Sequence, residues 1–548
     1  MVKSIFSLLY SRQTSILSGA TIIMVTVVLS KILGLVRDRI LVATFTPDTV
    51  AIFFAAFRIP DLIFQLLIFG ALSVAFIPVF TEYFEEKGRE DAFNLAQAIL
   101  NLALLLLLSV TIIIFIFADQ VTGLIVPGFN LAEQQEVANL TRIILLGQIM
   151  LTVGSFFVGM LQSFQRFIVP AFAGVFYNLG IILGILFLSP TLGISGPAIG
   201  VIMGAVMHSV IQLPLVYSMG FRFNFFKLFH PGVKEIFRLM SFRTLGLAAE
   251  QFNETVGLIL ASLISTVSVT YLTFAQHLQI VPIGLFGATI AQAALPVLSS
   301  EKTRGKIEEF KATLLTTMHQ ILFLTLPAAA ILIVIRVPAV RLVFGASQFD
   351  WPSTVLTGKT LAYLSIGLAA QAVSLLFVRG FYALKDTKTP VLISFLVVAL
   401  NIILSLYFVR ILGLQVWSLG LSFAIASILS SILLFLGLHF KTGGFDLKQV
   451  VNPLFKMLMA TVIMGASLYI PIKLLDQVIF DTTKTIGLLL LTGLSGLFAI
   501  FVYVIMVWFL KVRELKTFID LLKKVFFKAR TLGTQLKTEE LIHDPEGV

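Results

Sequence analysis

Long apolar segments constrain this chain more than any other feature. Of its 548 residues, 58% are hydrophobic and 12% are charged, whereas a soluble domain carries about 25% charged residues. Because a helix of about 20 apolar residues crosses the hydrocarbon core of a bilayer, the sequence predicts about fourteen membrane-spanning helices between residues 18 and 510. Outer-membrane strands, with about ten residues of alternating polarity, do not match these segments. The expected fold is an all-α polytopic membrane protein.

The placement of the positive charge predicts a topology. The chain has a formal net charge of +11. On alternate loops of the predicted helices, one side collects about 26 Lys and Arg residues and the other about seven, and the richer side faces the cytoplasm. Both termini lie on that cytoplasmic side. The excess is spread over short loops instead of forming one stripe, which argues against nucleic-acid binding.

Charged residues lie inside the first two apolar segments. Lys31, Arg37 and Asp38 belong to the first segment, and Arg58 belongs to the second. An ionised side chain at membrane depth costs a few kcal/mol, so it usually faces a protein interior or a water-filled cavity. These cations predict a polar cavity that receives an anion. Two alternatives stay open: Arg37 at an outer interface, and Arg58 in an ion pair with Asp61 or Asp38.

The chain also repeats itself. Residues 157–170 parallel residues 377–390, and residues 76–82 parallel residues 294–301, at offsets of about 218–220 residues. The offset spans an even number of predicted helices, so both copies have the same orientation, and a substrate site is expected between them.

This repeat predicts four domains. They are an N-lobe of about six helices at 1–220, a C-lobe of about six helices at 221–440, two C-terminal helices at 441–510, and a basic amphipathic tail at 511–548. A basic amphipathic segment binds the surface of an anionic leaflet, so the tail is expected on the inner leaflet.

Specific stretches carry a family resemblance. They include Ser30–Asp38 (SKILGLVRD), Ala56–Asp61 (AFRIPD), Gly70–Phe80 (GALSVAFIPVF) and Arg379–Val391 (RGFYALKDTKTPV). Over nearly its full length the chain resembles the MurJ (MviN) lipid II flippases of the multidrug/oligosaccharidyl-lipid/polysaccharide (MOP) exporter superfamily. The resemblance implies that undecaprenyl-pyrophosphoryl-disaccharide-pentapeptide moves from the inner to the outer leaflet of a bacterial cytoplasmic (inner) membrane by alternating access. It also implies a groove for the lipid tail formed by the helices at 441–510.

The resemblance suggests which residues line the cationic cavity. The two cavity cations of the family's first helix correspond to Lys31 and Arg37, and Asp38 follows as in the family. Arg58 is expected in the same cavity. His277 stands where the family often has an arginine, and histidine changes charge near neutral pH. A packing or hydrogen-bonding role is the alternative for His277.

The sequence leaves open which ion, if any, is coupled to transport. Family members can bind sodium through carboxylates and an asparagine, which Asn401 matches, but Gly257 and Ser405 stand where the carboxylates are expected. Hard cations prefer oxygen ligands that include negative charge, so the sodium site is expected to be altered or lost. Glu250 and Glu254 are candidates for proton coupling or for charge balance. Membrane potential, protons and sodium all stay open as energy sources, and no cofactor is expected.

An enzyme is the rival class. The chain has six scattered histidines and no cysteine, and it lacks a Walker loop and metal-spaced clusters, so no catalysis is expected. Within the superfamily, a multidrug exporter or an exporter of another polyprenyl-oligosaccharide is the main alternative. A scaffold that only binds cell-wall precursors is a third reading. The expected partners are lipid II and membrane lipids, with the elongation or division machinery of the cell wall left open.

Overall fold

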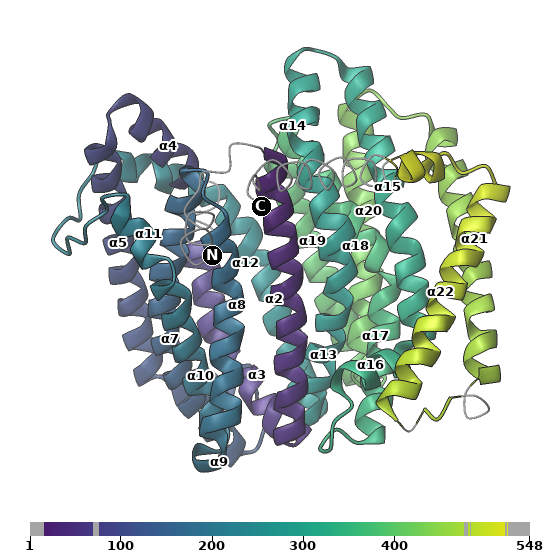
Figure 1. Ribbon diagram of the computed structural model, residues 1–548, viewed down its shortest axis with the longest axis horizontal. Coiled ribbons are helices and arrows are strands. Elements are labelled where there is room, and N and C mark those ends of the chain that lie inside the picture. Colours follow the sequence, from purple (N-terminus) through teal and green to yellow (C-terminus); the bar gives the residue numbers. More distant parts are fainter. Residues whose placement is uncertain (1–15, 70–75, 476–479, 483, 521–522, 524–548) are drawn as a thin grey trace, which may run out of the picture. The chain divides into compact units, whose positions relative to one another are not determined.

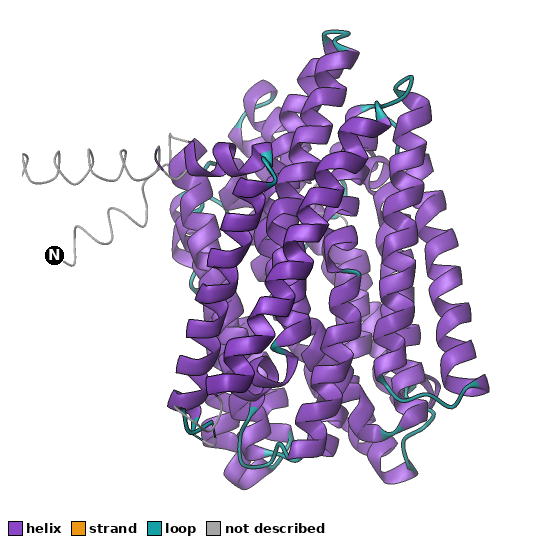
Figure 2. Ribbon diagram, turned by 90° about the vertical axis from the view of Figure 1, so that its right-hand side faces the viewer, coloured by secondary structure: helices purple, strands orange, loops and turns teal. Residues whose placement is uncertain are grey.

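All the regular secondary structure that the structure describes is helical. The computed structural model describes residues 16–69, 76–475, 480–482, 484–520 and 523. Helices and the loops between them make up these residues, and no strand forms among them (Figure 2). The predicted all-α polytopic fold is confirmed.

The helices follow one another through short connections. The first half contains α2 (Ile16–Thr44), α3 (Pro47–Phe64), α4 (Ile77–Glu86), α5 (Arg89–Ile116), α6 (Ala118–Ile125), α7 (Leu131–Ser163), α8 (Ile168–Leu183), α9 (Ser189–Leu192), α10 (Ser195–Val210) and α11 (Leu213–Ser218). The second half contains α12 (Gly232–Ile264), α13 (Thr266–Pro282), α14 (Thr289–Thr303), α15 (Ile307–Val334), α16 (Arg336–Phe344), α17 (Trp351–Ile366), α18 (Leu368–Ala383), α19 (Lys388–Leu406), α20 (Trp417–Lys441), α21 (Leu447–Leu475) and α22 (Thr485–Phe509).

Most of these helices are long and apolar enough to cross a bilayer. Within the described residues there are 11 such spans, or 12 if α17 and α18, separated at Gly367, form one broken span. Two further helices, α2 with 29 residues and α12 with 33, exceed the necessary length. The apolar half of α12 also holds Glu250 and Glu254, which lower its mean hydropathy. The count of about fourteen therefore stays a prediction.

The predicted repeat is visible in the helix boundaries. α5 begins at residue 89 and α15 at residue 307, a difference of 218 residues. Short π-helical turns recur in the same way: η1 (Gln65–Phe69) corresponds to η4 (Ile283–Ala288), and η3 (Gly184–Leu188) to η5 (Tyr407–Ile411). Such turns are rare, so their recurrence at corresponding positions indicates that the two halves of the chain are structural repeats.

One turn repeats in its backbone conformation. Gln165 has a φ of 58° and Lys385 a φ of 59°, a left-handed conformation that is uncommon for residues other than glycine. Each backbone N–H donates to the carbonyl three residues earlier, on Gln162 and on Tyr382, at 2.9 Å in both cases. The parallel between residues 157–170 and 377–390 is thus confirmed at the level of single residues.

The described chain divides into two compact units. Unit 1 comprises residues 1–281, 336–367 and 386–430, and unit 2 comprises residues 282–335, 368–385 and 431–548. Along the sequence, the two units alternate within the second half of the chain. The lobe boundaries at 220 and 440, and the tail groove at 441–510, therefore stay predictions.

Within unit 1, glycines bring α8 and α10 close together (Figure 1). A Cβ atom added at Gly204 would overlap the Tyr177 carbonyl, and one added at Gly180 would overlap the Gly204 backbone. Small residues at helix interfaces let backbones approach closely, which is a main source of packing in membranes.

A larger residue at this interface should destabilise the protein. We expect Gly204→Val to lower the free energy of unfolding by about 1–3 kcal/mol, because overpacking forces the two backbones apart. Thermal unfolding in detergent measures the change. Gly496→Val is the matched control, since a Cβ there meets nothing within 4 Å. Equal melting temperatures for Gly204→Val and Gly496→Val would contradict the close packing of α8 and α10.

The start of the C-terminal tail packs on unit 2. Val512 and Leu515 are buried, and Glu514 lies 3.4 Å from Nδ1 of His319 on α15. Phe518 and Ile519, by contrast, are exposed, so the expectation that the tail rests on the leaflet stays a prediction. Apart from Lys523, the tail beyond residue 520 lies outside the described residues.

Candidate functional site

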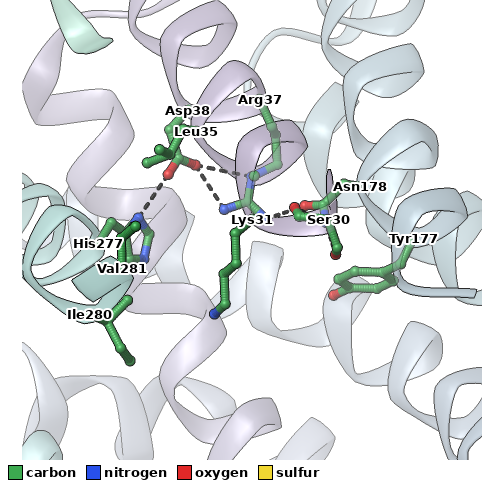
Figure 3. Close-up of a pocket in the computed structure, with 11 residues that line it drawn as sticks. Ser30, Lys31, Leu35, Arg37, Asp38, Tyr177, Asn178, His277, Ile280 and Val281 are labelled. Carbon is green, nitrogen blue, oxygen red and sulfur yellow. Dashed lines mark hydrogen bonds and ion pairs between the residues drawn. The ribbon is translucent and has the colours of Figure 1, made fainter. Parts of the chain in front are cut away.

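A polar cavity of about 250 Å³ opens among helices of unit 1 (Figure 3). Its wall comes from three helices, α2, α8 and α13. The lining residues are Ser30, Lys31, Gly34, Leu35, Arg37, Asp38, Tyr177, Asn178, His277, Ile280 and Val281. Four of the residues predicted from the sequence, Lys31, Arg37, Asp38 and His277, therefore lie together.

A buried carboxylate links the side chains of Arg37 and His277. Asp38 is only 1% exposed, and its Oδ1 accepts hydrogen bonds from Arg37 Nε at 3.0 Å and Nη2 at 2.7 Å. Its Oδ2 lies 2.7 Å from Nδ1 of His277. A buried charge is tolerated when it is paired and hydrogen-bonded, and here Asp38 has a partner on each oxygen. Asp38 therefore offsets the charge of Arg37 and also holds the imidazole of His277.

Asn178 fixes the other end of the Arg37 guanidinium. Its Oδ1 accepts from Arg37 Nη1 at 3.2 Å, while its Nδ2 lies 3.3 Å from Ser30 Oγ and 3.1 Å from the Gly174 carbonyl. The amide thus uses its donors on the two helices and leaves its oxygen for Arg37. Asn178 was not among the predicted site residues. The sequence feature that could have identified it is a single amide side chain within the apolar sequence of α8.

Lys31 supplies the cavity with an ammonium group that can bind an anion. Its side chain is exposed, and it extends between Ile280 and Tyr177 (Figure 3). Among the described residues, no hydrogen bond or ion pair engages its ammonium group. With Arg37 offset by Asp38, the cavity keeps a net positive charge that can attract an anion.

Comparisons with known proteins point to one family. The family model described as "Lipid II flippase MurJ" matches residues 42–480. The chain belongs to this family. A "Probable lipid II flippase MurJ" of Buchnera aphidicola subsp. Baizongia pistaciae is 27% identical over 413 residues, covering 74% of this chain and 80% of the relative. The Bdellovibrio bacteriovorus protein with the same description is 27% identical over 470 residues, covering 84% and 88%.

Solved structures share the fold. A MurJ lipid II flippase in an inward closed conformation matches with a TM-score of 0.73 and 23% identity, over 88% of this chain and 97% of the other. An inward-facing multidrug MATE transporter of the MOP superfamily matches with a TM-score of 0.66 and 16% identity, over 76% and 94%. Together with the apolar helices, the family assignment makes this chain a multi-pass membrane protein.

Arg58 lies outside the cavity of this MurJ family member. Its Nη1 donates to Glu254 Oε2 at 2.8 Å, and its Nη2 donates to the carbonyl and side-chain oxygens of Gln251 at 2.6 and 2.8 Å. Its Nε donates to Thr255 Oγ1 at 2.9 Å. Arg58 is not among the lining residues of this cavity, and α12 supplies acceptors for its whole guanidinium, so its role in the cavity stays a prediction. Arg58 joins α3 to α12.

Removing this guanidinium should destabilise unit 1. We expect Arg58→Met to lower the free energy of unfolding by about 1–3 kcal/mol, since the acceptors on Gln251 and Glu254 lose their donor. Thermal unfolding in detergent measures the effect, and Arg304→Met, in an exposed loop, serves as the control. An unchanged melting temperature for Arg58→Met would show that water replaces the guanidinium at no cost.

The candidate coupling residues are separate from the cavity wall. Asn401 Nδ2 donates to Asn253 Oδ1 at 2.7 Å, and the hydroxyls of Ser405 and Ser422 lie 2.6 Å apart. None of these contacts includes a carboxylate, and no group of three or more His, Asp or Glu residues suited to a metal ion occurs in the described part of the chain. Glu254 is engaged by Arg58. Loss of the sodium site therefore stays a prediction.

Proposed function

We propose that this protein moves lipid II from the inner to the outer leaflet of the bacterial cytoplasmic membrane. One observation carries the proposal: the cavity presents the exposed side chain of Lys31 beside the oriented guanidinium of Arg37. Lipid II carries a pyrophosphate and a large polar sugar-peptide, which cannot cross about 30 Å of hydrocarbon unaided. A cationic cavity replaces the water around the pyrophosphate, while the polyprenyl tail stays in lipid.

The residues of the cavity have different roles in this proposal. Lys31 binds a phosphate oxygen as a compact point charge, and Arg37 offers the planar fork that matches phosphate geometry. Asp38, His277 and Asn178 orient Arg37. The volume of about 250 Å³ lies below the range of about 300–1,000 Å³ for pockets that hold drug-sized ligands. The cavity therefore fits the pyrophosphate, and the sugar-peptide requires further opening during alternating access.

The membrane orientation follows from charge placement. Both termini and the Lys- and Arg-rich loops face the cytoplasm. In this arrangement the protein is a transporter without catalysis of its own. It works among membrane lipids, is driven by membrane potential, protons or sodium, and serves the elongation or division machinery of the cell wall.

Reconstitution tests the function. The full chain is placed in proteoliposomes with labelled lipid II, and its transfer between leaflets is followed by an impermeant quencher, with and without an imposed potential, proton gradient or sodium gradient. Transfer above that of protein-free liposomes supports the proposal. Absence of transfer under every gradient, together with efflux of a cationic dye, would instead support a multidrug exporter. Absence of both, with lipid II still bound, would support a scaffold.

A further inference from the structure

An irregular loop of unit 1 exposes several aromatic rings. Residues 221–231 join α11 to α12, and Phe225, Phe226 and Phe229 are 70%, 95% and 91% exposed. On the helices that flank the loop in sequence, Tyr217 on α11 and Phe237 on α12 are also exposed. An apolar patch of this kind marks a surface that contacts another phase or partner.

The loop is held in place by buried amides. Gln97 and Asn101 on α5 are buried. Gln97 Nε2 donates to the Arg222 carbonyl, and Asn101 Nδ2 donates to the carbonyls of Asn224 and Lys227 at 2.7 and 2.8 Å. Such amides are costly in an apolar helix unless they are hydrogen-bonded. The exposed rings are therefore presented by an ordered backbone.

The start of the loop is anchored by an aromatic core. Phe221 is fully buried, and its ring centroid lies 5.8 Å from that of Phe93 and 6.3 Å from that of Phe157. Phe221 thus ties the loop to α5 and α7, while the three exposed rings that follow lie outside this core. Phenylalanine therefore has two roles in this loop: Phe221 is buried and anchors it, and the three phenylalanines that follow are exposed.

The charge of the loop suits an anionic surface. Arg222 lies over the Tyr217 ring at 5.1 Å, and Lys227 and Lys234 follow. No Asp or Glu occurs between residues 221 and 234. Aromatic rings beside basic residues are typical of segments that lie at an anionic bilayer surface.

We propose that the loop 221–231 inserts its three exposed phenylalanines into the headgroup region of an anionic leaflet. The loop follows a membrane-spanning segment, Ser195–Ser218, and precedes α12, so it lies where the chain reaches the bilayer surface. Lys227 and Arg222 bind lipid phosphates, and the rings fill the boundary between headgroups and acyl chains. The leaflet is the cytoplasmic one if the charge-based topology holds.

The absence of cysteine from the sequence allows a direct test. Phe226→Cys is labelled with an environment-sensitive NBD probe, and the full chain is reconstituted in vesicles of phosphatidylglycerol and phosphatidylcholine. We expect blue-shifted emission and about twofold stronger quenching by a lipid with a spin label near the headgroup than by one labelled at the chain end. Lys302→Cys is the exposed polar control. Phe501→Cys, 62% exposed on α22, is the control facing the acyl chains.

Variants that remove the positive charges of the loop distinguish a lipid partner from a protein partner. With Arg222→Gln and Lys227→Gln added, quenching of the probe attached at position 226 should fall at least about twofold in anionic vesicles and stay unchanged in pure phosphatidylcholine. Water-like emission in all vesicles would overturn the proposal. So would a blue shift without lipid quenching, because another segment or protein would then cover the loop. Unchanged thermal unfolding confirms that the variants are folded.

Discussion

Arg37→Ala should lower the rate of lipid II transfer in proteoliposomes by at least about tenfold. Hydrogen bonds to charged groups contribute about 1.5–3 kcal/mol each, and a factor of ten in rate corresponds to about 1.4 kcal/mol. The variant removes the planar fork that Asp38 and Asn178 hold toward the cavity. Lys31→Ala should have a similar effect, because it removes the available ammonium group.

Conservative variants separate loss of charge from loss of shape. Lys31→Arg keeps the charge and should retain most of the transfer, whereas Arg37→Lys keeps the charge but loses the bidentate geometry and should be impaired. Arg304→Ala, in an exposed loop, is the control for net charge. Normal transfer by folded Lys31→Ala and Arg37→Ala would leave the flippase function in place but would place the headgroup elsewhere.

The sequence predicted the elements of the fold better than their details. The length of the apolar segments was sufficient to predict an all-α membrane protein, and the repeated turns around Gln165 and Lys385 were visible as a sequence parallel. The π-helical turns and the break at Gly367 were not predicted. A single added residue in a helix leaves little trace in hydropathy, since it changes hydrogen bonding and not composition.

The residues of the candidate site could be predicted where the sequence places a charged side chain inside an apolar segment. Lys31, Arg37 and Asp38 were selected because charge within an apolar helix requires a polar environment. Arg58 met the same criterion, but its acceptors on α12 lie far away in the chain, at sequence separations of 193–197. Tyr177 and Asn178 contribute through their side-chain positions, which only tertiary packing determines.

The carboxylate of Asp38 should set a balance between binding and release. Because Asp38 offsets Arg37, it competes with any anion for the guanidinium. Asp38→Asn keeps the shape but removes the charge, so we expect pyrophosphate to bind about tenfold more tightly. Transfer of lipid II should fall about tenfold as well, since tighter binding in the ground state slows release. Calorimetry with pyrophosphate and the proteoliposome assay measure the two quantities.

His277→Leu should have the opposite effect on binding. Without the imidazole, Asp38 Oδ2 loses its partner at 2.7 Å, and the carboxylate interacts with Arg37 alone. Pyrophosphate should then bind more weakly than to the unmodified protein, whereas Asp38→Asn strengthens its binding. If Asp38→Asn and His277→Leu instead weakened pyrophosphate binding equally, Asp38 would only position Arg37 and would not compete with the anion for its guanidinium. The sign of the change therefore distinguishes a carboxylate that releases the substrate from one that only supports the site.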